Sequence, residues 1–196
     1  MWREKLIDFV KDFKHPAWGI SHFTRVYELT LKLAEMKELD VDQDSLFAAA
    51  YLHDMSAFEP YRKKNIDHAD AAADSCEDVL ISIGFPSDKI DLVKDIIRTH
   101  MYYAKPSNQI ESILFRDADI LDFMGIIGVT RIISITGKES MAPDLKSAIS
   151  LLKNFQKTLL QKLSTDQAKE IGIKRKGEMK EFLDNLSYET NKFKLL

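Results

Sequence analysis

Residues 45–54 read SLFAAAYLHD, and this stretch decides the fold of the chain. A helix over about residues 44–53 is apolar on nearly all of its faces, which predicts that it lies in the centre of a helical core. The stretch ends in His53 and Asp54, and a carboxylate in such surroundings is costly to bury unless it is paired or bound to a metal. The alternative for Asp54 is that its carboxylate reaches solvent at the end of the helix.

Helical patterns continue on both sides of this central segment. With only 7 Gly and 5 Pro among 196 residues, the sequence favours long helices over a sheet of many strands. Apolar residues three and four positions apart predict amphipathic helices through most of the chain. The expected ranges are about 3–13, 21–38, 44–53, 67–84, 87–100, 108–124, 125–136, 144–163 and 165–186, with a polar loop over 55–66. The expected fold class is therefore all-α.

The composition excludes several classes of protein. The 28 Lys and Arg against 31 Asp and Glu give a net charge of −3, so we expect no nucleic-acid partner. No apolar run approaches the ~20 residues that span a bilayer, and the N-terminus lacks a signal-peptide core, so we expect no membrane partner. Cys76 is the only cysteine, which rules out an internal disulfide and fits a reducing compartment. We expect a cytoplasmic protein, and the sequence leaves its oligomeric state open.

Four of the five histidines fall on the apolar stripes of four different predicted helices: His22, His53, His68 and His100. A single histidine on an apolar face is usually a hydrogen-bonded core residue. Four buried rings are harder to satisfy, because interior polar partners are scarce. A shared divalent metal satisfies them together, since neutral imidazole is the commonest metal ligand. His15 lies in a turn outside these stripes and is expected to be structural or exposed.

The acidic segment RDADILD, residues 116–122, offers further ligands. Two imidazoles and two carboxylates give a divalent ion a neutral set of ligands and leave positions for water and substrate. That set suits Mn, Fe, Ni, Co or Mg better than the thiolate-rich sites of structural zinc. The sequence therefore predicts one such divalent ion as a cofactor.

Three motifs together resemble the H…HD…D pattern of the HD-domain superfamily of metal-dependent phosphohydrolases. They are SHFTRV at 21–26, AAAYLHDMS at 48–56 and RDADILDFMGIIGVTRI at 116–132. Within the superfamily, the chain is most similar to small stand-alone bacterial HD hydrolases that act on nucleotides. The resemblance covers about residues 15–137. It implies one HD-type helical bundle over residues 1–196, with a helical C-terminal segment at about 144–196.

The resemblance also implies which residues bind the metal: His22, His53, Asp54 and one aspartate of the 116–122 segment. The last ligand of the superfamily usually lies in an Ala-Asp-x-Leu context, which points to Asp119. Helical periodicity instead places Asp117 on the apolar line of its helix. We therefore favour Asp119 and keep Asp117 as the alternative ligand or as a residue that supports it.

Two further histidines match additional positions of the superfamily. In two-metal members, the positions of His68 and His100 bind a second ion, whereas in one-metal members they can contact the substrate phosphate. The resemblance therefore leaves a second metal possible in this chain. Asp54, His68, His100 and Arg25 are accordingly the predicted catalytic residues. The implied activity is cleavage of phosphate or pyrophosphate bonds in nucleotides or related small phosphate compounds. A divalent ion suits this reaction because it lowers the pKa of a bound water and polarises a phosphoryl oxygen.

Phosphate esters need more positive charge than one ion supplies. Arg25 lies one helical turn after His22 and can point the same way, although it could instead form a salt bridge with an aspartate. Arg62, Lys63 and Lys64 follow the doublet closely in sequence and are the predicted substrate-binding residues. The alternative for this basic triplet is ordinary surface charge.

Two other functions use the same ligand types. One is a di-iron oxygenase, because some HD-fold proteins with two added histidines activate O₂. The other is a metal- or nucleotide-binding sensor module that has lost turnover. The presence of all the ligand types argues against the sensor.

Overall fold

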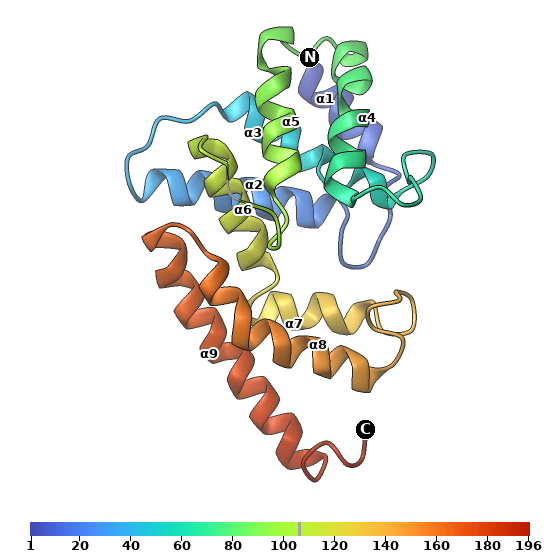
Figure 1. The fold of residues 1–196 in the computed structure, drawn as a ribbon, viewed down its shortest axis with the longest axis vertical. Helices are drawn as coiled ribbons and strands as arrows, with labels where there is room; N and C mark the ends of the chain where they lie inside the picture. Colours follow the sequence, from blue (N-terminus) through green and yellow to red (C-terminus); the bar gives the residue numbers. More distant parts are fainter. Residues whose placement is uncertain (106) are drawn as a thin grey trace. The chain divides into compact units, whose positions relative to one another are not determined.

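The computed structural model describes residues 1–105 and 107–196, and all regular secondary structure in these residues is helical (Figure 1). This confirms the predicted all-α class. The elements are α1 (Trp2–Val10), α2 (Ile20–Glu35), α3 (Gln43–Leu52), η1 (Met55–Ala57), α4 (His68–Ile83), η2 (Ser87–Lys89), α5 (Ile90–Thr99), α6 (Ile110–Asp122), α7 (Gly125–Ser134), α8 (Leu145–Thr158), η3 (Leu159–Lys162) and α9 (Asp166–Glu189), where η marks a 3₁₀ helix.

The chain divides into two compact units, Met1–Asp119 and Ile120–Leu196. Helix α6 begins in the first unit and ends in the second. All the histidines belong to the first unit. The expectation of a single domain over residues 1–196, with its core at about 15–137, remains a prediction.

Helix α3 is the centre of the first unit. Every residue from Ser45 to Leu52 is buried, and the helix contacts α1, α2, α4 and α5. The side chain of Asp42 accepts a hydrogen bond from the Ser45 N–H at 2.8 Å and so begins the helix. Because other helices surround α3, its C-terminal end brings the following residues, His53 and Asp54, into the interior. The burial expected from the apolar sequence is confirmed.

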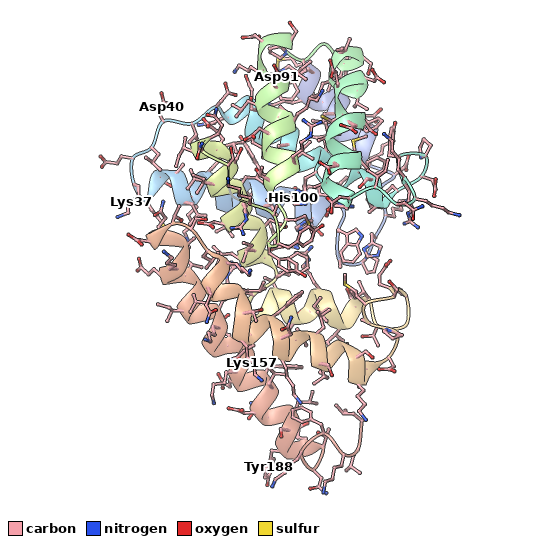
Figure 2. All side chains as sticks on the ribbon, viewed as in Figure 1. Lys37, Asp40, Asp91, His100, Lys157 and Tyr188 are labelled. Carbon is pink, nitrogen blue, oxygen red and sulfur yellow. The ribbon has the colours of Figure 1, made fainter. Side chains whose placement is uncertain are left out.

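Helices α4 and α5 pack along each other and place two histidines at helix ends. His68 is the first residue of α4, directly after Asp67, whose side chain accepts a hydrogen bond from a backbone N–H of the first turn. His100 directly follows α5, and Figure 2 shows it at the opposite end of that helix from the exposed Asp91. Gly84 ends α4 in a left-handed conformation with φ of 81°, where the sequence predicted the end of the helix.

Three segments differ from the ranges predicted by periodicity. Residues 87–89 form a 3₁₀ turn before α5, and residues 159–162 form another after α8. Residues 55–57, expected in a loop, form a third. Short 3₁₀ turns are common at helix ends, where fewer backbone bonds fix the geometry. The spacing of apolar residues does not distinguish these tighter turns from α-helix.

A buried ion pair joins α6 to α7 in the second unit. Arg131 Nη1 lies 2.9 Å from Asp122 Oδ2, and both side chains are almost completely buried. The Arg131 guanidinium also lies 4.1 Å from the centroid of the Phe123 ring. Gly128 lets the two helices approach, because a Cβ atom at this position would overlap the backbone carbonyl of Phe123. The turn between these helices therefore depends on a glycine and on a buried pair of charges.

Helix α9 lies against α7 and α8 in the second unit. Its Arg175 donates a hydrogen bond from Nη1 to the backbone oxygen of Leu121, which satisfies a carbonyl near the C-terminal end of α6. Helix α9 has 24 residues, but charged side chains recur along it. Within residues 1–105 and 107–196, no helix has the length and apolar character needed to cross a bilayer.

Candidate metal centre

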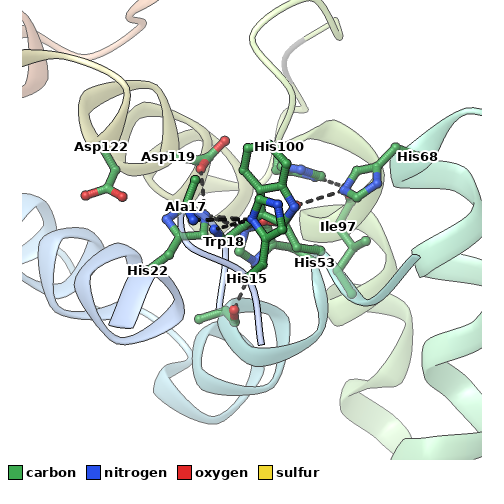
Figure 3. Close-up of polar contacts among 12 residues, drawn as sticks. His15, Ala17, Trp18, His22, His53, His68, Ile97, His100, Asp119 and Asp122 are labelled. Carbon is green, nitrogen blue, oxygen red and sulfur yellow. Dashed lines mark hydrogen bonds and ion pairs between the residues drawn. The ribbon is translucent and has the colours of Figure 1, made fainter. Parts of the chain in front are cut away.

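Three helices bring four side chains of the first unit to one place, and Figure 3 labels three of them, His22, His53 and Asp119. His22 comes from α2, His53 and Asp54 follow α3, and Asp119 comes from α6. His22, His53 and Asp119 are no more than 3% exposed. The cluster therefore lies inside the protein, close to the end of the central helix.

The donor atoms of this cluster lie at the separations expected around one small ion. The Nε2 atoms of His22 and His53 are 3.1 Å apart. Asp54 Oδ2 is 3.4 Å from His22 Nε2 and 3.3 Å from His53 Nε2, and Asp119 Oδ1 is 3.5 Å from His22 Nε2. Because metal–ligand bonds to such atoms measure about 2.0–2.2 Å, neighbouring ligands of one ion lie roughly 3 Å apart. These four residues fit a divalent ion in both donor type and spacing.

The geometry distinguishes the two aspartates of α6. His22, His53 and Asp119 form a group whose ligand atoms all lie within 4.8 Å of one another. Asp117 is also fully buried, but it belongs to neither of the two candidate metal groups found among the described residues. This grouping agrees with the prediction of Asp119 as the ligand, which stays a prediction with Asp117 as its alternative.

Backbone carbonyls orient two of the imidazole rings toward the cluster. His53 donates a hydrogen bond from Nδ1 to the Ala50 oxygen at 2.9 Å, and His100 donates from Nδ1 to the Ile97 oxygen at 2.6 Å. Each ring follows the last residue of a helix, where a carbonyl three residues earlier is available. A neutral ring that carries its hydrogen on Nδ1 presents the lone pair of Nε2, which is the form that binds a metal.

The charges of Asp54 and of the imidazoles around it shift the pKa values of Asp54 and His53. Burial raises the pKa of its carboxyl, but the interactions with His53, His22 and His68 outweigh burial and hold that pKa well below its usual value. For His53, burial lowers the pKa, while Asp54 and Asp119 more than reverse this and raise it. A positive charge is therefore favoured among these side chains, and a divalent ion provides such a charge without a proton.

His68 and His100 lie beside the four ligand candidates. His68 Nε2 is 2.8 Å from Asp54 Oδ1, the carboxylate oxygen that does not face His22 and His53. The His100 ring is 5.0 Å from that of His53 and 5.9 Å from that of His68, measured between centroids. His100 Nε2 is buried and has no hydrogen-bond partner among the described residues. With His53 and Asp54, His100 forms the second group that could hold an ion.

The unfolding free energy of the metal-free protein should decline below pH 6.5 in part because of His100. Burial, with a further contribution from His53, lowers the pKa of His100 from 6.5 to about 3. The unfolded chain therefore binds a proton that the folded protein does not. The stability that this residue contributes is complete above pH 6.5 and is lost toward pH 3, by at most about 1.4 kcal/mol per pH unit.

Urea unfolding at pH 7, 6 and 5 tests this expectation on wild type and His100→Ala. The variant should lose less stability than wild type over the same pH range, whatever its absolute stability. The same slope in both proteins would show that His100 takes up a proton as readily as it does in the unfolded chain.

The predicted phosphate-binding cations lie in different surroundings. Arg25 lies on α2, one turn after His22, and is partly exposed. Arg62 and Lys64 are exposed in the loop before α4, and Arg62 donates a hydrogen bond to the Ala57 oxygen. These positions leave the proposed roles of the three residues as predictions.

Lys63 is exposed and lines a surface pocket. This pocket, of about 460 Å³, is lined by α1, the loop before α4, and α4, including Phe9, Tyr61 and Asp78. Its lining contains none of the four ligand candidates among the residues described. Proximity in sequence to His53 and Asp54 suggested a substrate role for Lys63, and that role stays a prediction.

Two residues near the site were not predicted from the sequence. Ser56 contacts His68, and its only sequence signal is its position two residues after Asp54. Arg116 is buried, and its guanidinium donates to the backbone oxygens of Met101 and Tyr102, the two residues after His100. Burial lowers the pKa of Arg116, and the neighbouring Asp117 and Asp119 oppose this. A buried cation thus lies among the acidic residues of α6.

Known proteins share this arrangement of helices. The HD domain family model matches residues 19–124. Bacillus subtilis YpgQ, solved in complex with ADP, is 20% identical with a TM-score of 0.71, over 95% of this chain and 97% of that one. A Lactobacillus plantarum protein is 21% identical (TM-score 0.72, 97% and 95% covered), and a Bacillus thuringiensis HD-superfamily hydrolase is 24% identical (TM-score 0.65, 96% of each). The comparison with curated proteins found no match. At these identities the solved structures establish the shared fold.

Proposed function

The chain belongs to the HD-domain family, and from this we propose that it is a metal-dependent phosphohydrolase acting on nucleotides or related small phosphate compounds. One observation carries the proposal: two imidazoles and two carboxylates converge, with ligand atoms of His22 lying 3.1–3.5 Å from those of His53, Asp54 and Asp119. Mn, Fe, Ni, Co and Mg all accept such ligands. The ADP in the YpgQ structure supports a nucleotide as the substrate class.

The chemistry follows from the positions of the side chains. A divalent ion in such a site lowers the pKa of a water molecule and polarises a phosphoryl oxygen. Asp54 directs one carboxylate oxygen at His22 and His53 and the other at His68. His68 is partly exposed, so its Nε2 is placed to exchange a proton with substrate or water. His100 stays neutral and offers a lone pair in the buried part of the site.

Metal analysis of purified protein, combined with a phosphate-release screen over nucleoside mono-, di- and triphosphates, tests the proposal. We expect about one divalent ion per chain and release of phosphate or pyrophosphate from at least one nucleotide. Efficient degradation of long RNA or DNA with the nucleotides untouched would contradict it. Metal binding without turnover of any phosphate compound would favour the sensor.

Replacing His68 or His100 with alanine should lower turnover by ~10²-fold or more, the scale of losing one transition-state contact. One ion per chain should remain, because His22, His53, Asp54 and Asp119 do not need these two rings. Steady-state kinetics and metal analysis on the same samples measure both effects. Loss of all metal would instead place the two histidines among the ligands of a coupled two-ion site, and full activity would make them core residues.

A second candidate function rests on the second group of ligands. His53, Asp54 and His100 could hold another ion next to the first, and His100 Nε2 has no hydrogen-bond partner in the described residues. Two adjacent iron ions would suit a di-iron oxygenase. A UV–visible spectrum of iron-loaded protein under air separates the two functions, because an oxygenase should show oxygen-dependent absorption bands that a hydrolase lacks.

A further inference from the structure

His68 differs from the other histidines of the site in how its Nδ1 is held. His53 and His100 follow the last turns of helices, where a carbonyl three residues earlier accepts the Nδ1 hydrogen. His68 is the first residue of α4, so no preceding turn offers such a carbonyl. Its Nδ1 instead lies 2.7 Å from the hydroxyl oxygen of Ser56, in the 3₁₀ turn after Asp54.

The hydrogens of this contact can be assigned by counting donors. The Ser56 hydroxyl has one hydrogen, and it is donated to the backbone oxygen of His68 at 2.8 Å. A carbonyl oxygen can only accept, so the hydroxyl oxygen must accept the hydrogen that lies between it and the ring. His68 therefore carries a hydrogen on Nδ1. Asp54 Oδ1 lies 2.8 Å from Nε2, and a carboxylate oxygen can only accept, so Nε2 also carries a hydrogen while this contact is made.

We propose that Ser56 is a positioning residue that fixes the ring orientation and the Nδ1–H form of His68. The inference rests on the proposed function for its kinetic consequence. With Nδ1 committed to Ser56, Nε2 is the ring nitrogen through which His68 exchanges a proton during turnover. Ser56 is only 5% exposed, so water competes little for its hydroxyl. Ser56 thus accepts the Nδ1 hydrogen of His68, as backbone carbonyl oxygens accept the Nδ1 hydrogens of His53 and His100.

The test combines NMR with kinetics on Mg²⁺-loaded protein labelled with ¹⁵N-histidine. The variants are Ser56→Ala, which removes the hydroxyl, and Ser56→Thr, which keeps it. Ser75→Ala is the matched control, because Ser75 lies on α4 and its hydroxyl donates to the Ala71 oxygen rather than to a histidine. The signals of His68 are assigned by their absence in His68→Ala.

Wild type should show a hydrogen bound to His68 Nδ1, and Ser56→Ala should lose that signal or exchange it rapidly with water. In the same variant, kcat for nucleotide hydrolysis should fall about three- to tenfold, the effect of one neutral hydrogen bond, with KM and metal content unchanged. Ser56→Thr should keep the Nδ1–H signal and most of the wild-type kcat. Ser75→Ala should match wild type in both readouts.

A wild-type His68 without a hydrogen on Nδ1 would overturn the inference, and this result needs no variant. So would a Ser56→Ala protein that keeps both the signal and the wild-type kcat. If Ser56→Ala does not fold, the Nδ1–H signal of His68 in wild type and in Ser56→Thr decides whether the inference holds. If no protein in the series hydrolyses nucleotides, the proposed function fails, while the NMR signals still decide the role of Ser56.

Discussion

Replacing Asp54 with alanine should abolish both metal binding and turnover. Its carboxylate contacts His22 and His53 through one oxygen and His68 through the other, so one substitution removes contacts to three imidazoles. Loss of a residue that only supports a ligand typically costs 10–100-fold in metal affinity, and we expect a larger loss for a direct ligand. His53→Ala should behave in the same way. Metal analysis after dialysis and a phosphate-release assay measure the two effects.

The thermal stability of the metal-loaded protein should fall as well. An ion that binds only the folded state stabilises it by about 2.7 kcal/mol when its concentration is one hundred times its dissociation constant. Added metal should therefore raise the melting temperature of wild type but not that of Asp54→Ala. His15→Ala is the matched control, since His15 stacks on Trp18 outside both candidate metal groups and should retain metal and activity. Stoichiometric metal in a protein lacking both His53 and Asp54 would refute the site.

Replacing Arg131 with methionine should destabilise the protein by about 3–5 kcal/mol. The substitution removes the guanidinium from the buried carboxylate of Asp122, 2.9 Å away, and from the face of Phe123. For a chain of this size, that loss corresponds to a melting temperature lower by roughly 10 °C. Urea unfolding followed by circular dichroism measures the change in free energy.

Two further variants show whether the buried charge is the cause. The double variant Asp122→Leu/Arg131→Met replaces both charges with apolar groups and should recover much of the lost stability. Lys180→Met breaks an ion pair with Asp184 that is largely exposed, and it should leave the unfolding midpoint almost unchanged. Equal destabilisation by Arg131→Met and by the double variant would attribute the loss to packing rather than to charge.

Much of the fold could be predicted from local patterns. The run SLFAAAYL is apolar on all sides, and the structure buries every one of its residues. Gly84 ends α4 because glycine tolerates the left-handed conformation that closes a helix. Helix type and helix ends depend on neighbours in sequence, so the all-α class and most boundaries followed without any tertiary information. The 3₁₀ turns at residues 87–89 and 159–162 were missed because apolar spacing does not resolve them.

The sequence by itself determined which residues can act as ligands, since His53 and Asp54 end an apolar helix and other histidines recur on apolar stripes. Only the tertiary structure decided which of them meet. Asp117 and Asp119 are both buried on α6, so burial and periodicity could not separate them, yet only Asp119 groups with His22 and His53. Lys63 lies near the doublet in sequence, yet the pocket that it lines contains none of the four ligand candidates among its described lining residues. Helical spacing fixes the direction of a side chain on its own helix, whereas the convergence of side chains from several helices depends on how those helices pack.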